Sequence, residues 1–479
     1  MRGVTYTTPP TKLSSSTLEQ LTIPHPSYDR AKVQIGIVHF GVGGFHRAHQ
    51  AMYVDKLLEM GLASEWGICG VGLLANDRRM AEVMEAQDGL YTLLLEHPDG
   101  HREARVIGSI VDYRYAPDDQ EGVIELLAAP TTKIISMTIT EGGYYIDSAP
   151  EINVFGLVTE ALVRRRDRGI GSPTIVSCDN IEGNGDVARK AFTTYAERVH
   201  PGLGEWMSAN TRFPNSMVDR ITPATSDRER AILAKEFGVE DNWPVFCEPF
   251  RQWVLEDRFT DDRPPLEKVG VQFVPDVSPY ELMKIRILNG GHAAIAYPAG
   301  LMDIHFVHEA MAEPLVRGFL DKIEHDEIVP TVPPVPDTSL EDYYRLIERR
   351  FANPKIGDTV RRLCLDGSNR QPKFIIPTIA DRLKAGEGVA GLALESALWC
   401  RYCHGTTDSG AVIEPNDPNW DRMQATARKA KDDPSAWLAM EDIYGEVGRS
   451  AVFADAFGKA LNALWKDGAR ATLERYLAG

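Results

Sequence analysis

The sequence predicts an α/β protein in which a domain built on a mostly parallel sheet precedes a mostly α-helical domain. Between residues 33 and 179, short apolar runs alternate with helical patterns, which is typical of the strands and crossover helices of a parallel sheet. After Glu281 the patterns are helical throughout. This change of character predicts two domains, residues 1–280 and residues 281–479.

The first predicted strand, Val33–Phe40, is an apolar, β-branched run that leads directly into Gly41-Val-Gly43-Gly44. A strand that ends in Gly-x-Gly before a helix is typical of dinucleotide-binding turns. One glycine allows the tight turn, and the next lets the backbone approach a pyrophosphate at the start of the helix. The third glycine of the usual pattern is absent, and His46 takes its place. We therefore expect a nucleotide site here, with a plain turn as the alternative.

The second predicted strand, Trp66–Leu73, ends shortly before Asn76 and Asp77. An acidic side chain after the second strand normally accepts hydrogen bonds from the adenosine ribose hydroxyls, which favours NAD over NADP. Asp77 lies about 30 residues beyond the glycines rather than about 20, so the connecting helix and loop must be long. The alternative is that Asp77 caps the helix that begins at Arg78.

Two further predicted strands, Lys133–Thr140 and Thr174–Cys178, also end in polar residues. Open parallel sheets bind ligands outside the carboxyl ends of their strands, so we expect Thr140 and Asn180 to lie at that edge. Asp219 follows another apolar run and precedes an arginine. Each of these residues is also compatible with ordinary loop chemistry, as an Asx-turn or a surface ion pair.

The helical pattern that opens the second domain, Glu281–His292, places four polar side chains on one face. At 100° per residue, Glu281, Lys284, Asn289 and His292 fall within roughly 140° of arc. A carboxylate, a lysine, an amide and an imidazole that face one space suit removal of a hydroxyl proton and stabilisation of the resulting alkoxide. Apolar side chains share this face, so a core helix with a few paired polar groups is the alternative.

The composition excludes several classes of partner. The chain has 479 residues and a formal net charge of −17, which argues against nucleic acid and anionic membrane surfaces as partners. The polar, proline-rich N-terminus does not resemble a signal peptide, and no apolar run is as long as the roughly 18 residues that span a membrane. Six dispersed cysteines predict neither a disulfide scaffold nor a metal site. We expect a soluble, cytoplasmic protein without a metal.

Taken together, these motifs resemble the polyol-specific long-chain dehydrogenases, the family of mannitol 2-dehydrogenase and fructuronate reductase. The likeness covers roughly residues 30–475. It rests on Gly41-Val-Gly-Gly-Phe-His-Arg-Ala-His49, Thr140-Glu-Gly-Gly143, Ser177-Cys-Asp-Asn180, Met217-Val-Asp-Arg220, Cys247-Glu-Pro-Phe250 and the Lys284-x-x-x-x-Asn289-Gly-x-His292 pattern. The resemblance implies a zinc-independent, NAD(P)-dependent oxidation of a sugar alcohol by a Rossmann-type domain and a helical domain.

The resemblance also implies catalytic roles. Lys284 matches the family's base, and Asn180 and Asn289 match the amides that hold the reacting oxygen. His292 matches a substrate-positioning group. Glu281 matches a carboxylate that relays the proton, although its charge would hinder deprotonation of the lysine. A free lysine has a pKa near 10.4, so the role of Lys284 implies a buried site that lowers this value.

Four further residues match or border the family's substrate site. Asp219 matches a substrate-positioning group and Arg362 a substrate-hydroxyl contact. Arg370 stands where mannitol dehydrogenases can carry lysine. Arg286 stands where a fructuronate reductase has arginine, so it can pair with a substrate carboxylate or with an acidic residue of the protein. In the second case a buried Arg286 must have an aspartate or glutamate within salt-bridge distance.

The glycine turn and the strand ends supply the groups that we expect to contact the cofactor. These are Gly41, Gly43, Gly44, Phe45, Arg47, Asn76, Asp77 and Thr140. We expect the cofactor to be NAD, with NADP less favoured, and we expect no metal.

The expected reaction is the reversible oxidation of D-mannitol to D-fructose by a monomeric enzyme. One alternative is reduction of D-fructuronate, where Arg286 or Arg370 would pair with the carboxylate. Others are oxidation of D-arabinitol and a non-catalytic nucleotide-binding sensor that keeps the fold. The intact set of Lys284, Asn289 and His292 argues against the sensor, because a sensor needs no base.

Overall fold

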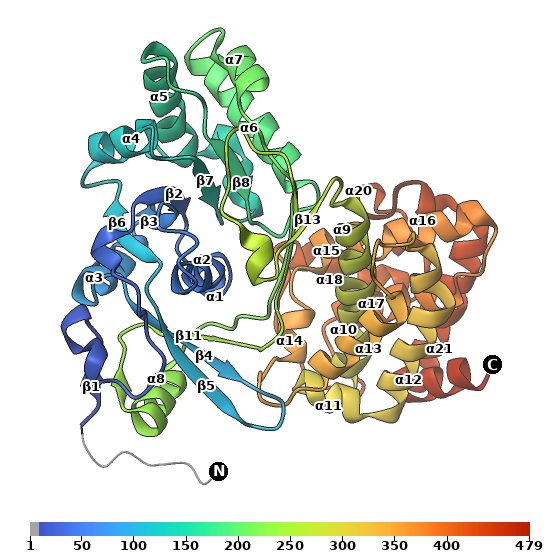
Figure 1. Cartoon of the computed structure of the whole chain (residues 1–479). Coiled ribbons are helices and arrows are strands. Elements are labelled where there is room, and N and C mark those ends of the chain that lie inside the picture. The colour runs from blue at the N-terminus through green and yellow to red at the C-terminus, as the bar shows by residue number, and fades with distance from the viewer. Residues whose placement is uncertain (1–8) are drawn as a thin grey trace. The chain divides into compact units, whose positions relative to one another are not determined.

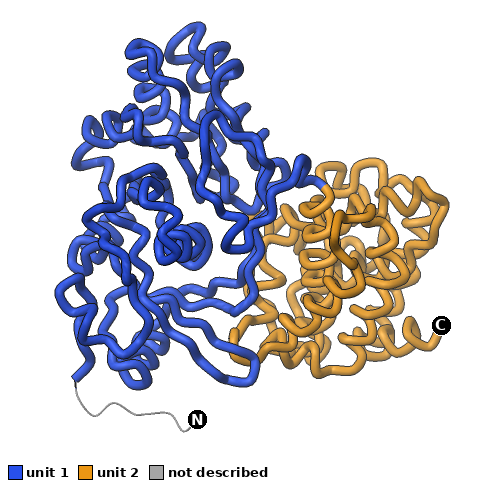
Figure 2. The backbone as a smooth tube through the Cα atoms, in the orientation of Figure 1, with its two compact units in different colours: residues 1–278 blue, residues 279–479 orange. Residues whose placement is uncertain are grey.

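The computed structural model of the chain describes residues 9–479 (Figure 1). The chain divides into two compact units, residues 1–278 and residues 279–479 (Figure 2). All strands that the structure describes lie in the first unit, and the second unit is helical. The predicted fold class, a mostly parallel sheet domain followed by a mostly helical domain, is confirmed.

The core of the first unit is a five-stranded parallel sheet with the strand order β6-β3-β2-β7-β8. Its strands are β2 (Ile35–Phe40), β3 (Gly67–Gly72), β6 (Ile110–Tyr115), β7 (Ile134–Met137) and β8 (Thr174–Ser177). The chain runs outward from β2 in one direction through β3 and β6, and then in the other through β7 and β8. The connections therefore reverse between β2 and β7, and open parallel sheets bind ligands at such a point.

Helices cover both faces of this sheet, which explains why β2 is apolar except at His39, whose ring is buried and lies 2.8 Å from the hydroxyl of Ser136. The helices of the unit are α1 (Gly44–Ala48), α2 (Gln50–Glu59), α3 (Asp77–Ala86), α4 (Gln120–Ala128), α5 (Val154–Asp167), α6 (Asn184–Val199), α7 (Leu203–Asn210) and α8 (Asp227–Ile232). Successive side chains of a strand point to opposite faces. Ile37 accordingly packs in the core with α2, whereas Val38 and Phe40 pack with α4 and α5.

Smaller sheets complete the first unit. One consists of β11 (Val245–Cys247), β4 (Tyr91–Glu96) and β5 (Arg102–Ile107), and another of β13 (Gln272–Val274), β12 (Gln252–Glu256) and β9 (Ser216–Asp219). The remaining pair is β1 (Thr11–Lys12) with β10 (Val239–Glu240). The pairs β4–β5 and β9–β12 are antiparallel, so the unit is mostly and not purely parallel.

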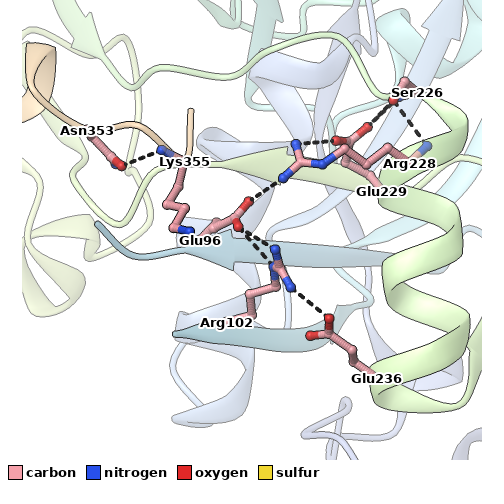
Figure 3. A network of polar contacts seen from close by, with 8 residues as sticks. All are labelled: Glu96, Arg102, Ser226, Arg228, Glu229, Glu236, Asn353 and Lys355. Carbon is pink, nitrogen blue, oxygen red and sulfur yellow. Dashed lines mark hydrogen bonds and ion pairs between the residues drawn. The ribbon is translucent and has the colours of Figure 1, made fainter. Parts of the chain in front are cut away.

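A network of ion pairs ties β4 and β5 to α8 and to the π-helical turn that follows it, Leu233–Phe237 (Figure 3). The carboxylate of Glu96 is almost fully buried and lies 2.6 Å from Arg102 and 3.4 Å from Arg228. Arg102 also lies 2.7 Å from Glu236. A buried carboxylate is tolerated only when it is paired, so these contacts hold the β4–β5 hairpin against the helical segment.

The second unit packs its helices around α17. The helices are α9 (Ser278–Met283), α10 (Gly290–Leu301), α11 (Val307–Ala312), α12 (Pro314–Ile323), α13 (Leu340–Phe351), α14 (Val360–Leu363), α15 (Gly367–Phe374), α16 (Ile376–Ala385), α17 (Ala390–Cys403), α18 (Trp420–Ala430), α19 (Ser435–Leu438), α20 (Glu441–Tyr444) and α21 (Ala451–Ala478). α17 packs against α10, α12 and α21 and is buried from Gly391 to Cys403. A helix enclosed in this way is mostly apolar on all sides, and the buried polar side chains of α17, such as Glu395, need hydrogen-bond partners.

Residues 435–444 do not form one continuous helix. The segment forms α19 and α20, and Met440 between them leaves the helical region with a ψ of 89°. The last helix, α21, bends at Gly468, whose φ of 79° is readily adopted only by glycine.

Glu395 on the buried helix α17 gives a stability prediction. Its side chain accepts a hydrogen bond of 2.6 Å from Gln371, and burial raises its pKa from the usual 4.5 to about 8. The folded protein therefore keeps a proton that the unfolded chain releases above pH 4.5. The free energy of unfolding therefore falls as the pH rises from 4.5 to about 8, and the loss reaches about 3 kcal/mol at pH 7.

Glu395→Gln keeps the shape and an acceptor oxygen for Gln371 but cannot ionise. We expect the variant to exceed the wild type in unfolding free energy at pH 7 and to match it near pH 4. Urea denaturation across this pH range is the measurement. A difference that does not change with pH contradicts the assignment.

Candidate active site

A π-helical turn, Lys284–Asn289, lies between α9 and α10. The prediction of one regular helix from Glu281 to His292 is wrong at this point. In a π-helical turn the hydrogen bonds close from residue i to residue i+5, so residues five apart lie one above the other. Lys284 and Asn289 have this spacing, whereas a regular α-helix would separate them by about 140°. Such turns occur frequently at functional sites.

The polar side chains of this segment are withdrawn from water. Glu281 is 6% exposed and Lys284 is 8% exposed. The Oδ1 atom of Asn289 is buried and has no hydrogen-bond partner within residues 9–479. Burial of ionisable side chains is costly, so Glu281 and Lys284 need polar partners or a chemical role that offsets this cost.

His292 lies beside an aromatic ring and three guanidinium groups. Its imidazole stacks on Phe351, with the ring centroids 4.2 Å apart. Burial lowers the pKa of His292 well below its usual range, and the charges of Arg362, Arg350 and Arg370 lower it further. The imidazole is therefore neutral at pH 7. The structure thus brings together three predicted site residues, and it adds Arg350 and Phe351, which no sequence motif distinguished.

The guanidinium of Arg362 is already paired within its own unit. It donates to both carboxylate oxygens of Asp358, four residues earlier in the chain. Arg370 donates to the backbone carbonyl of Arg362 at 3.3 Å. Asp358, which the sequence did not single out, therefore balances the charge of one of the two arginines.

Arg286 lies in the π-helical turn between Lys284 and Asn289, and it is almost fully buried. It forms an ion pair with Asp381 and donates to the backbone carbonyl of Thr331 at 2.7 Å. The predicted acidic partner is confirmed. Its guanidinium therefore anchors the turn and is already engaged by partners within the protein.

Removal of the acidic partner should destabilise the second unit. We expect Asp381→Asn to cost about 2 kcal/mol of unfolding free energy, because it leaves a buried guanidinium without its counter-charge. The cost is below that of a fully buried pair because Asp381 is 53% exposed. The control is Asp455→Asn, which breaks the exposed pair with Lys459. Equal effects of the two variants on urea denaturation would refute the anchoring role.

In the first unit, the reversal point of the sheet is built from Gly41 and Thr138. Gly41, just after β2, has a φ of 86°, and a Cβ atom there would lie 2.1 Å from the carbonyl oxygen of Thr138. The hydroxyl of Thr138 donates to the carbonyl of Gly41 at 2.6 Å. His39 lies 3.3 Å from the same carbonyl through Nε2. Only glycine fits at position 41, which supports the dinucleotide-binding prediction.

The residues that follow Gly41 differ in their exposure to solvent. Gly43 is exposed, and a Cβ there would have no neighbour closer than 3.9 Å, so a ligand can approach its backbone. Gly44 and Phe45 are partly exposed. Arg47 is 2% exposed and donates to the backbone carbonyls of Gly43 and Trp243. The side chain therefore holds the glycine turn from inside the protein.

Asp179 organises the loop that carries Thr140. Its carboxylate accepts hydrogen bonds from the backbone N–H groups of Ile139 and Thr140 and from the hydroxyl of Tyr144. Thr140 has a φ of 63°, a conformation that a β-branched residue adopts only under constraint, at a cost of about 1–3 kcal/mol. Asp179 was not among the predicted site residues, although it precedes Asn180, which lies exposed after β8.

Asp77 is the first residue of α3 and lies just beyond the end of β3. Its Oδ2 atom accepts hydrogen bonds from the backbone N–H groups of Leu73 and Leu74, both at 2.8 Å. The capping position is taken by Asn76, which makes no side-chain capping bond. The alternative that Asp77 is the helix cap is therefore wrong, and its carboxylate lies where a ribose-binding acid is expected.

Asp219 ends β9 and is buried. The neighbouring Arg220 is also buried and donates to the backbone carbonyls of Glu248 and Ala48. The alternative of a surface ion pair is therefore wrong for Arg220.

Within residues 9–479, the structure contains no group of three or more histidine, cysteine, aspartate or glutamate side chains placed to hold a metal ion. In the same part of the chain, no helix combines the length and apolar character needed to cross a bilayer.

Two family models match the chain: the mannitol dehydrogenase Rossmann domain over residues 35–268 and the mannitol dehydrogenase C-terminal domain over residues 276–465. The mannitol 2-dehydrogenase of Cereibacter sphaeroides is 53% identical, over 95% of this chain and 99% of that protein. The enzyme of the same name from Phaeosphaeria nodorum is 42% identical, over 97% and 85%.

Solved structures agree with these relatives. The ternary complex of Pseudomonas fluorescens mannitol 2-dehydrogenase with NAD and D-mannitol matches with a TM-score of 0.87 and 41% identity, over 98% of this chain and 100% of that one. A substrate-free D-sorbitol dehydrogenase matches with a TM-score of 0.88 and 35% identity, over 96% and 100%.

Proposed function

Because the chain belongs to the mannitol dehydrogenase family, we propose that it catalyses the reversible, NAD-dependent oxidation of D-mannitol to D-fructose. The observation that carries this proposal is the match, along nearly the whole chain, to an enzyme solved with NAD and D-mannitol. The residues of the first unit fit the cofactor, because Gly41 and the open backbone at Gly43 form a turn that a side chain would fill.

Lys284 acts as the general base in the proposed mechanism. NAD, when bound, accepts the hydride from the C2 carbon of the polyol, and the lysine takes the proton from the C2 hydroxyl. Burial of Lys284 favours the neutral amine that this step requires. Asn289, one π-helical turn away, donates a hydrogen bond to the developing alkoxide, and Asn180 has the same role by resemblance to the family. Glu281 receives the proton from the lysine.

Two of the arginines in the second unit already have acidic partners, which favours a neutral polyol over a uronate. Arg286 is paired with Asp381, and Arg362 is paired with Asp358. Neither guanidinium is left without a counter-charge for a substrate carboxylate. Asp219, Arg362, Arg370 and His292 are the proposed contacts to the substrate hydroxyls.

A substrate panel tests the proposal. We expect D-mannitol to exceed D-sorbitol and D-arabinitol in kcat/KM with NAD. In the reverse direction we expect fructose to exceed fructuronate by roughly tenfold or more, because Arg286 is already paired with Asp381 and cannot pair with the carboxylate without losing that contact. Absorbance of the reduced nicotinamide is the readout. A higher kcat/KM for fructuronate would establish the uronate reductase, and absence of turnover with every substrate would establish the sensor.

The monomeric state and the cytoplasmic location also belong to the proposal. The formal charge of −17 opposes close association of copies and is consistent with a soluble monomer. Sedimentation equilibrium of the purified chain tests the first point, and cell fractionation tests the second.

A further inference from the structure

The residues after β3 give conflicting signals about the cofactor. Asp77 is an acid in the position that binds the ribose hydroxyls of NAD. The next two residues, Arg78 and Arg79, are cations of the kind that bind the 2′-phosphate of NADP. The sequence therefore contains the recognition elements of both cofactors side by side.

The structure shows that Arg78 is engaged elsewhere. Its Nη2 atom donates to the carboxylate of Asp118 at 2.6 Å, and its guanidinium carbon lies 4.5 Å from the centroid of the Tyr115 ring. Tyr115 ends β6, the strand that pairs with β3, and Asp118 lies in the turn that follows it. The ion pair and the aromatic ring thus hold the guanidinium of Arg78 near the end of β6.

Arg79 is held in a different way. Its guanidinium carbon lies 4.9 Å from the centroid of the Trp243 ring, and no ion pair with an acidic residue is found for it in the described part of the chain. Substitution of Asp118 therefore affects the charge balance of Arg78 directly, and Arg79 provides a matched control.

We propose that Arg78 is a latent ligand for the 2′-phosphate of NADP, and that Asp118 and Tyr115 hold it away from that position. This inference rests on the proposed use of NAD by this chain. Two features then exclude NADP: the carboxylate of Asp77 repels the 2′-phosphate, and Asp118 competes with the phosphate for Arg78. The side chains of Arg78 and Asp118 are 53% and 58% exposed, so their ion pair is weak and its effect emerges only after the charge of Asp77 is removed.

The test uses three variants of the full chain: Asp77→Asn, Asp77→Asn/Asp118→Ala, and the latter with Arg78→Ala. Dissociation constants for NADH and NADPH are measured by nicotinamide fluorescence at low and high salt. We expect the double variant to bind NADPH about fivefold more tightly than Asp77→Asn at low salt, with NADH binding unchanged. The gain should be lost on adding Arg78→Ala and should shrink at high salt.

The control is Arg79→Ala in the double variant, which should keep the gain. The proposal is overturned if Asp118→Ala brings no gain for NADPH, or if the gain survives loss of Arg78. Because the readout is binding and needs no substrate, a wrong polyol assignment leaves this test intact. Failure of NADH itself to bind would instead contradict the proposed function.

Discussion

Lys284→Ala should lower kcat for mannitol oxidation by about 10³-fold while the dissociation constant of NAD stays within twofold of the wild type. A positioned general base contributes about 10²–10⁴-fold, and the proposed role of Lys284 is on the substrate oxygen and not on the cofactor. Steady-state kinetics and fluorescence titration with NADH measure the two quantities.

A control variant and a chemical rescue test whether the loss of kcat comes from the missing amine. Lys459→Ala removes an exposed lysine of the same unit and should leave kcat unchanged. Because Lys284 is almost fully buried, its replacement by alanine leaves space for a small amine, so added methylamine should restore part of the rate. Turnover of Lys284→Ala within tenfold of the wild type would refute the assignment of the base.

The second large effect concerns the choice of cofactor. The unaltered protein should strongly prefer NAD, because a 2′-phosphate would meet the carboxylate of Asp77. We expect Asp77→Asn to shift the ratio of kcat/KM for NADP to that for NAD by roughly 100-fold, since like charges in contact cost several kcal/mol. Kinetics with each cofactor at saturating mannitol are the measurement.

The comparison of Asp77→Asn with Asp77→Ala separates charge from loop structure. Asparagine keeps an oxygen that can accept from the N–H groups of Leu73 and Leu74, and alanine does not. We expect both variants to lose the preference for NAD and alanine to weaken NAD binding further. Equal use of NAD and NADP by the wild type would contradict the role of Asp77.

The features that could be predicted from the sequence depend on local pattern. Ile35–Phe40 is a strand between two helical layers, and the mostly apolar run Val33–Phe40 indicates this directly. Gly41 needs a positive φ, which glycine adopts without strain. The helical second domain follows from periodicity alone. The positions of Thr140 and Asn180 beyond strand ends follow from the same pattern.

The pairing of distant residues was decided only by the tertiary structure. Arg286 forms an ion pair with Asp381, which lies 95 positions away in the sequence. Asp179 accepts a hydrogen bond from the backbone N–H group of Thr140, which lies 39 positions away. The sequence required an acid near Arg286, because a buried guanidinium needs one, but could not identify it. The side chain of Arg47 likewise points into the protein, because the carbonyl of Trp243 accepts from it.

The π-helical turn shows the same limit within one helix. Residues 281–292 have the periodicity of a regular helix, and on that basis alone the four polar side chains share a broad face. Packing around the turn decides whether each N–H group donates to the carbonyl four or five residues earlier. This packing includes the contacts of Arg286 with Asp381 and Thr331. The sequence by itself therefore determined that a helix presents a lysine, an amide and an imidazole on one broad face. Tertiary packing decided that Lys284 and Asn289 lie one above the other, because it set the hydrogen bonds of the turn.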